Sequence, residues 1–254
     1  MTLTLTPLFN IPLVNRGDDL AALFVAALGG EGLVLEPGDI LVVAQKIVSK
    51  AEGRFVNLST VSPSREAVDL AQQVGKDARL MELVIQESKR ILRTRPGTII
   101  VEHRLGFVCA NAGIDHSNVN GQDEGEEWML LLPENPDASA QELRMRIEEM
   151  CEVQLGILII DSHGRAWRMG TAGVAIGLSG MPGLVDLRGE QDLFGNTLRI
   201  TQVGAADELA SAASLVMGQA AEGTPLVHVR GFPYELREGR LSELIRPEEQ
   251  DLFR

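Results

Sequence analysis

The stretch ILIIDSHGR, from Ile157 to Arg165, places four aliphatic residues directly before an aspartate and a serine. A short, continuous apolar run bounded by turn-forming residues predicts a strand that is buried on both faces. We expect this strand to end at Asp161 and Ser162, with the DSHG segment forming a turn. Sheet proteins often place metal and phosphate chemistry at the carboxyl ends of strands, which makes both residues site candidates. The alternative is a structural turn in which Asp161 caps the backbone.

The rest of the chain mixes helices and strands without strict alternation. Strands are predicted at DILVVAQ (39–45), TIIVEH (98–103), GFVCAN (106–111) and TPLVHVRG (224–231), the middle two as a hairpin. Helices are predicted at 18–30, 64–75 and 77–92, from Pro136 onward, and at 206–219. This pattern predicts an α+β (mixed α/β) fold. Since no Pro- or Ser-rich linker is present, we expect any second domain to be inserted into the first.

Composition excludes several classes of protein. The 254 residues carry a net charge of −13, which argues against nonspecific binding to nucleic acid or to anionic membranes. The apolar runs are too short to span a bilayer, and the N-terminus lacks the basic region of a signal peptide. The two cysteines, Cys109 and Cys151, have no metal-type spacing. We therefore expect a cytoplasmic protein with reduced thiols.

A second candidate site segment is CANAGIDHSNVN, from Cys109 to Asn120, which follows a predicted strand. It supplies a carboxylate at Asp115 and an amide at Asn118, and hard cations bind such oxygens. Two strand-end aspartates, Asp115 and Asp161, together indicate a divalent-metal site more strongly than either alone. Hard-metal sites prefer oxygen to imidazole, so we interpret His116 and His163 as flanking residues. The alternative is that Asp115 is an ordinary turn residue.

Two further segments suit a phosphate-bearing ligand. In AQKIVSKAEG, Lys46 and Lys50 are four residues apart and share a face if the segment is helical. In MGQAAEGTP, from Met217 to Pro225, Gln219 is a possible oxygen ligand and the loop amides are possible phosphate donors. The alternatives are a solvated helix face and an ordinary connector. The sequence has no P-loop, no GxGxxG after a strand, no Ser-His-Asp signature and no CxxC.

Taken together, these segments resemble the coenzyme F420-0:L-glutamate ligase family, the gamma-glutamyl ligases of deazaflavin coenzyme synthesis. The resemblance runs in family order over nearly the whole chain. It is carried by the matching pieces GDILVVAQKIVSKAEGR, ESKRILR, GFVCANAGIDHSNV, LGILIIDSHGRAWRMGTAGVAIGLSG, DLFGNTLRIT and ADELASAASLVMGQAAEGTPLVHVRG. Because the chain stops at Arg254, it resembles the stand-alone form, without a C-terminal nitroreductase-like domain.

The resemblance implies a GTP-dependent reaction. GTP phosphorylates the phospholactyl carboxylate of coenzyme F420-0, and the amino group of L-glutamate attacks the acyl phosphate, releasing GDP and phosphate. Further glutamates join through γ-linkages. The cofactors implied are two divalent cations, Mn²⁺ or Mg²⁺, together with K⁺. The fold implied is a two-domain arrangement, which we place at residues 1–75 with 185–254 and an inserted domain at 76–184, assembled as a homodimer.

The resemblance also assigns residues. It implies that Asp115 and Asp161 are catalytic residues, and that the metal ligands are Asp115, Asp161, Ser162 and Gln219. The nucleotide-binding residues that it implies are Ile11, Pro12, Leu13, Val14, Gln45, Lys46, Lys50, Asn118, Met217, Gly218, Gln219, Ala220, Ala221, Glu222, Gly223 and Thr224. Two positions depart from the family pattern: Ser162 replaces the more frequent threonine, and Ala221 replaces an acidic residue. Candidate acceptor contacts are Arg90, Arg93, Arg104 and Arg168.

Two other functions remain open at this point. A carboxylate–amine ligase that acts on another phosphorylated acid would keep the same metal and nucleotide segments. A noncatalytic nucleotide or deazaflavin binder would have no need of Asp115, Asp161 and Gln219.

Overall fold

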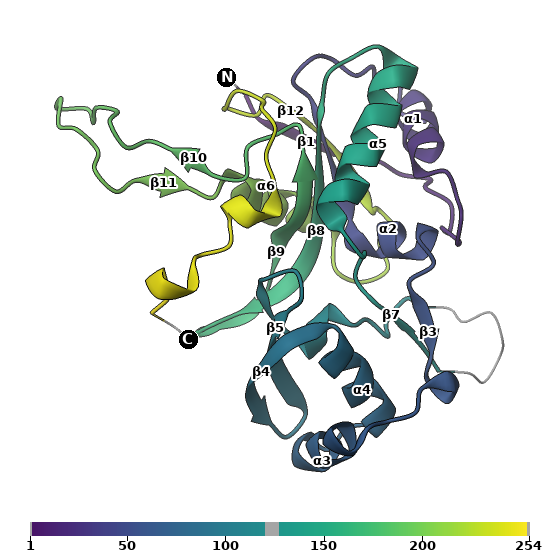
Figure 1. The fold of residues 1–254 in the computed structure, drawn as a ribbon. Coiled ribbons are helices and arrows are strands. Elements are labelled where there is room, and N and C mark those ends of the chain that lie inside the picture. Colours follow the sequence, from purple (N-terminus) through teal and green to yellow (C-terminus); the bar gives the residue numbers. More distant parts are fainter. Residues whose placement is uncertain (1, 120–126, 253–254) are drawn as a thin grey trace.

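A computed structural model describes residues 2–119 and 127–252 of the chain. Its centre is a five-stranded sheet with the order β1-β12-β2-β8-β9 (Figure 1). The strands β2 and β8 run parallel, and the other neighbours are antiparallel. The bounds are β1 Thr4–Pro7, β2 Ile40–Ala44, β8 Gly156–Arg165, β9 Arg168–Ser179 and β12 Leu226–Arg230.

Helices cover both faces of this sheet (Figure 1). On one face, Leu41, Val43 and Ile157 pack in a core shared with the helices α1 (Leu20–Gly30), α2 (Gln45–Ala51) and α5 (Pro136–Cys151). On the other face, Ile40, Val42 and Leu158 pack against α6 (Ala205–Met217). Successive residues of a strand point to opposite faces, so an unbroken aliphatic run serves both cores. Each such buried side chain contributes about 2 kcal/mol through burial of apolar surface.

A second group of elements lies beside the central sheet, between α2 and α5 in the chain (Figure 1). It contains a three-stranded sheet, β4-β5-β6, and a two-stranded sheet, β3-β7, with a separate apolar core. Its bounds are β3 Phe55–Asn57, α3 Arg65–Val74, α4 Ala78–Gln86, β4 Ser88–Arg95, β5 Thr98–His103, β6 Val108–Ala110 and β7 Trp128–Leu130. The predicted division into 1–75 with 185–254 and 76–184 stays a prediction. The sheets do not follow its boundaries, since β8 and β9 pair within the same sheet as β2.

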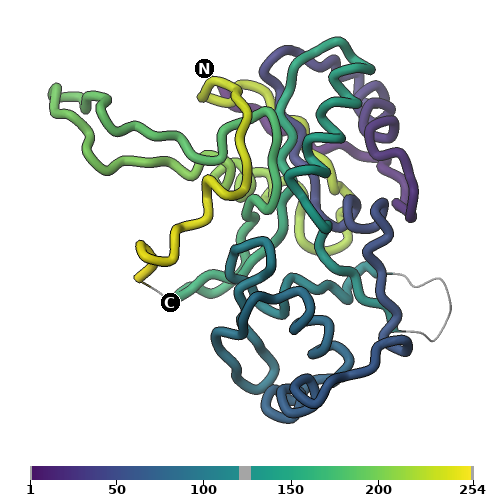
Figure 2. Tube along the Cα trace, viewed as in Figure 1, coloured from purple at the N-terminus to yellow at the C-terminus, as the bar shows by residue number. Residues whose placement is uncertain are grey.

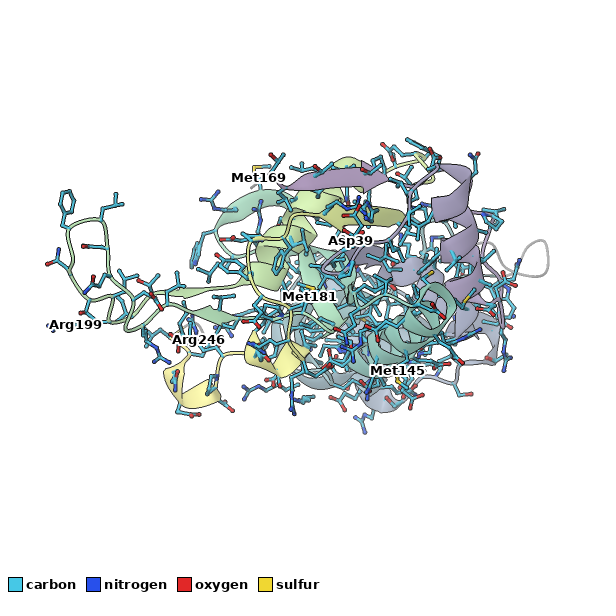
Figure 3. All side chains as sticks on the ribbon, turned by 90° about the horizontal axis from the view of Figure 1, so that it is seen from above. Asp39, Met145, Met169, Met181, Arg199 and Arg246 are labelled. Carbon is cyan, nitrogen blue, oxygen red and sulfur yellow. The ribbon has the colours of Figure 1, made fainter. Side chains whose placement is uncertain are left out.

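An arm projects from the body of the molecule between β9 and α6 (Figure 2). It carries the short antiparallel pair β10 (Val185–Asp186) and β11 (Gln202–Val203). Figure 3 shows Arg199 on this arm, far from Met181 in the interior. The side chains of Leu193, Phe194 and Ile200 on the arm are almost fully exposed.

Two predicted boundaries are wrong. The predicted helix over 77–92 ends at Gln86, and Ser88–Arg95 instead forms β4, because this segment pairs with β5. The predicted turn at DSHG is also wrong: β8 continues to Arg165 because it pairs with β9 in a long hairpin. The pairing with β2 does end at Ile160, so Asp161 lies at the carboxyl end of the parallel pair although it is inside a strand.

Candidate functional site

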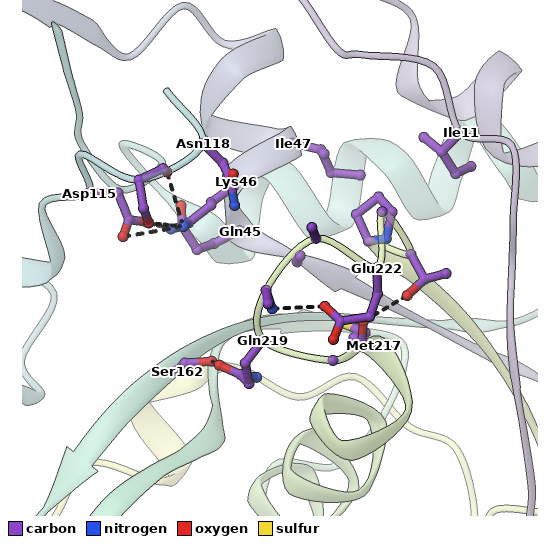
Figure 4. Close-up of a pocket in the computed structure, with 18 of the residues that line it drawn as sticks. Ile11, Gln45, Lys46, Ile47, Asp115, Asn118, Ser162, Met217, Gln219 and Glu222 are labelled. Atoms are coloured by element: carbon purple, nitrogen blue, oxygen red, sulfur yellow. Dashed lines mark hydrogen bonds and ion pairs between the residues drawn. The ribbon is translucent and has the colours of Figure 1, made fainter. Parts of the chain in front are cut away.

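A cavity of about 640 Å³ opens where β2 and β8 end, beside α2 and the loop that follows α6 (Figure 4). The structure brings all the predicted cation and nucleotide residues to its walls. These residues come from five separate segments: 11–14, 44–50, 115–118, 160–162 and 217–225. The cavity therefore gathers the segments in one place, while their individual roles stay predictions.

Asp115 is presented by an unusual turn. Asn111, Ala112 and Gly113 all have left-handed backbone angles, with φ of 52°, 54° and 65°. Small side chains tolerate this conformation, and a Cβ on Gly113 would lie 2.7 Å from a methyl carbon of Leu132. The backbone of Asp115 then exchanges two hydrogen bonds of 2.9 Å with Leu130. The turn and this bridge fix the position from which the carboxylate enters the cavity.

The Asp115 carboxylate is held by the start of α2. The Gln45 side-chain amide donates to Oδ2 of Asp115 over 2.7 Å, and the Lys46 ammonium lies 3.5 Å from Oδ1. The Ser49 hydroxyl in turn donates to the side-chain oxygen Oε1 of Gln45. Burial raises the pKa of Asp115 to about 6; Lys46 opposes this rise and the nearby charge of Asp161 adds to it. A bound cation would relieve this unfavourable environment for the carboxylate.

Asp161 and Ser162 are neighbours on β8 and therefore point to opposite faces of the strand. Asp161 accepts a hydrogen bond of 3.0 Å from Nε2 of His163, on its own face. On the other face, the Ser162 hydroxyl donates to the side-chain oxygen Oε1 of Gln219 over 2.9 Å. The Gln219 amide then donates to the hydroxyl of Ser214 on α6. Of the four predicted ligands, Ser162 and Gln219 are thus joined by a hydrogen bond, and the carboxylates Asp115 and Asp161 lie near enough for their charges to interact.

The loop after α6 carries its own acidic group. Gly218 ends the helix with φ 77° and ψ 178°, a conformation that is essentially restricted to glycine. The Glu222 carboxylate folds back and accepts a hydrogen bond of 2.8 Å from the backbone N–H of Ala220 (Figure 4). This contact lowers the pKa of Glu222. The Thr224 hydroxyl closes the loop by donating to the carbonyl of Met217 over 2.7 Å.

Two lysines bring positive charge to the cavity from one helix. Lys46 and Lys50 lie on α2, four residues apart, as the helical interpretation predicted. Lys46 also donates to the hydroxyl of Ser117 over 3.1 Å. Burial, and then the charge of Lys46, lowers the pKa of Lys50. An anionic ligand that pairs with both ammonium groups would remove their mutual repulsion.

The donor set suits a hard divalent cation. Asp115 and Asp161 offer carboxylate oxygens, Ser162 offers a hydroxyl and Gln219 offers an amide oxygen, and Mg²⁺ and Mn²⁺ bind such ligands. Within residues 2–119 and 127–252, no three His, Cys, Asp or Glu side chains form a metal-binding group. A cation here would therefore complete its coordination with water or with oxygens of a ligand.

Some cavity residues were missed by sequence reasoning, and some predicted contacts lie elsewhere. Ser117, Thr171 and Ser214 also line the cavity. Ser214 was detectable as a polar residue on the buried face of a helix, whereas nothing in the sequence singles out Thr171. The acceptor candidates Arg90, Arg93, Arg104 and Arg168 are absent from the lining. Arg90 and Arg104 instead form ion pairs with Glu102 and Glu87.

Comparison with known proteins gives the family. The sequence model of the family described as F420-0:Gamma-glutamyl ligase matches residues 9–231. The chain is 46% identical, over 256 residues and the full length of both chains, to a protein named coenzyme F420:L-glutamate ligase from Methanothermobacter thermautotrophicus. Proteins of the same name from Methanopyrus kandleri and Archaeoglobus fulgidus are 47% and 41% identical, over 95% and 100% of this chain and 93% and 97% of theirs. The chain therefore belongs to the F420-0:gamma-glutamyl ligase family.

No helix in the described part of the chain is both long and apolar enough to cross a membrane.

Proposed function

We propose that this chain is a ligase that joins L-glutamate to the phospholactyl carboxylate of coenzyme F420-0, with GTP as the phosphoryl donor. One observation carries the proposal: a single cavity holds Asp115 and Asp161 together with Lys46, Lys50 and the 217–225 loop. The names of the relatives support the acceptor and the amino acid. They do not name the nucleotide, which rests on the family resemblance of the cavity segments.

The cavity supplies what activation of a carboxylate requires. A carboxylate oxygen of the acceptor attacks the terminal phosphorus of GTP, and GDP leaves. The amine of L-glutamate then attacks the acyl carbon, and phosphate leaves as the amide forms. Phosphoryl transfer depends mainly on positioning and on neutralising the phosphate charge. Lys46 and Lys50 bring two positive charges into the cavity.

The chain's own residues fall into matching roles. Asp115 and Asp161 would hold one divalent cation and Ser162 with Gln219 a second, which agrees with the charge interaction between the two carboxylates and the hydrogen bond between Ser162 and Gln219. When bound, such cations screen the phosphate oxygens and polarise the transferred group. The hydroxyl of Ser214 orients the Gln219 amide so that its carbonyl oxygen faces Ser162. Gln45 fixes the orientation of the Asp115 carboxylate.

The proposal includes features that follow only from the resemblance. These are the homodimer, the use of K⁺ and the addition of further γ-linked glutamates.

The test is an end-point assay by mass spectrometry. Purified protein is mixed with coenzyme F420-0, L-glutamate and Mn²⁺, with GTP in one tube and ATP in another. The proposal predicts a product heavier by one or more glutamyl residues in the GTP tube. A folded protein that binds nucleotide but yields no heavier product would contradict the proposed acceptor and favour another acid or a binding role. Product with ATP alone would contradict the proposed nucleotide.

A further inference from the structure

The two cavity carboxylates are held in different ways. Asp115 has two side-chain partners, Gln45 and Lys46, that themselves line the cavity. Across residues 2–119 and 127–252, the side chain of Asp161 has one hydrogen-bonding or ion-pair partner, which is His163. His163 is not part of the cavity lining. The orientation of Asp161 therefore depends on a single residue outside the site.

The geometry of the contact shows which ring nitrogen of His163 donates a hydrogen bond to Asp161. Its Nε2 lies 3.0 Å from Oδ2 of Asp161, and a carboxylate only accepts hydrogen bonds, so Nε2 carries the proton. This nitrogen is thus turned toward the carboxylate, which leaves Oδ1 of Asp161 without a protein partner among the described residues. The side chain of His163 is 9% exposed, so water competes little for the bond.

The imidazole ring is itself held by the second group of elements. Phe107, in the turn between β5 and β6, packs against the ring of His163 with centroids 5.2 Å apart. Phe107 also stacks on the ring of His103, with centroids 5.1 Å apart and the two rings nearly parallel. Because Asp161 and His163 are two residues apart on β8, their side chains share a face. The packing of Phe107 therefore fixes the ring in the place from which it reaches Asp161.

We propose that His163 is a positioning residue that orients the Asp161 carboxylate for a divalent cation. By donating to Oδ2, it holds the carboxylate in one rotamer and leaves Oδ1 free for the cation. Residues that hold the ligands of a metal ion in this way typically affect metal affinity 10- to 100-fold when they are replaced. The identity of the cation rests on the proposed function, whereas the role of His163 rests on its own contacts.

Two substitutions of similar size separate the hydrogen bond from the packing. His163→Gln keeps an N–H that can reach Asp161, and His163→Leu removes the donor; both remove the ring. A matched control is His228, whose Nε2 lies 2.8 Å from Oδ2 of the buried Asp39, outside the cavity. His228→Leu removes a comparable histidine–carboxylate contact in which neither residue lines the cavity.

The measurement is direct Mn²⁺ binding in the presence of GTP, followed by the paramagnetic signal of free Mn²⁺, with thermal unfolding recorded alongside. His163→Leu should weaken Mn²⁺ binding about 10- to 100-fold, His163→Gln should stay within about 3-fold of wild type, and His228→Leu should leave the affinity unchanged. If His163→Leu does not fold, His163→Phe, which keeps a ring against Phe107, replaces it with the same expected loss.

The outcomes distinguish this inference from the proposed function. If the wild type binds Mn²⁺ and makes product, and His163→Leu binds Mn²⁺ equally well, the role of His163 alone would be overturned. Equal losses in His163→Leu and His163→Gln would assign the effect to packing and would also overturn it. A wild type that neither binds Mn²⁺ nor makes product would overturn both proposals.

Discussion

The side-chain amide of Gln45 donates a hydrogen bond of 2.7 Å to the carboxylate of Asp115. Gln45 begins α2 at the end of the central sheet, whereas Asp115 follows β6 in the second group of elements. The contact therefore joins the two parts of the chain at the wall of the cavity.

Replacing Asp115 tests the role of this carboxylate. Asp115→Asn should lower turnover at least about 100-fold, because the site loses charge that a divalent cation needs. The fold should be retained, since burial already disfavours the ionised carboxylate and raises its pKa to about 6. Initial rates and thermal unfolding of the variant check both parts. The control is Asp186→Asn on the exposed arm, which should leave the rate unchanged. Wild-type-like turnover in Asp115→Asn would reject the cation role.

Alanine substitutions at two glycines of the loop after α6, Gly218 and Gly223, distinguish steric crowding from backbone strain. A Cβ on Gly218 would lie 2.3 Å from the carboxyl carbon of Glu222, whereas a Cβ on Gly223 would meet nothing within 4 Å. Both have positive φ, so each alanine variant loses about 1 kcal/mol or more of stability. Only Gly218→Ala should also displace Glu222 and weaken GTP binding, by about 10-fold or more. Calorimetric titration with GTP checks this, and equal affinities for the two variants would contradict the role of the folded-back carboxylate.

The second group of elements contains a buried acid whose ionisation makes stability depend on pH. Burial raises the pKa of Glu87, but contacts with His103, Arg104 and Arg54 outweigh it and lower the pKa to about 2. Arg54 and Arg104 lie 3.1 Å and 2.8 Å from its two oxygens. The folded-state pKa is below the unfolded value of about 4.3, so the stabilisation is fully present above that pH and is lost as the pH falls toward 2.

Glu87→Gln should therefore lower the free energy of unfolding at pH 7 by about 3 kcal/mol. The difference from wild type should shrink as the pH falls from about 4.5 toward 2. Urea unfolding of both proteins over this range checks it. A difference that stays constant with pH would show that Glu87 stabilises by packing alone.

The sequence predicted the elements whose signals are local. Asp19 caps α1, which ends at Gly30 as expected, and the hairpin of β5 and β6 forms where its two apolar segments predicted it. Four of the predicted cavity segments converge because they lie next to strand ends at one edge of the central sheet, whereas the segment of Asp115 reaches the cavity from the second group of elements. The resemblance supplied the residue assignments within them, which spacing alone left open.

The failures involve contacts distant in sequence. No strand was predicted between Met169 and Gly183, yet β9 occupies Arg168–Ser179. Its glycines permit close helix packing: a Cβ on Gly173 would lie 2.4 Å from the carbonyl oxygen of Ala210 on α6, and one on Gly177 would lie 2.4 Å from Pro136 on α5. No single-sequence pattern encodes those approaches. Likewise, the contact of His163 with Asp161 was not predicted, because it requires β8 to continue past the predicted turn.

The central claim is that the cavity activates a carboxylate by phosphorylation, and one isotope measurement tests it most directly. The acceptor is prepared with oxygen-18 in both oxygens of its terminal carboxylate and is converted with GTP and L-glutamate. Attack by that carboxylate on GTP followed by attack of the amine predicts inorganic phosphate that carries one oxygen-18 atom and an amide that retains the other. Glutamylated product accompanied by unlabelled phosphate would contradict the claim.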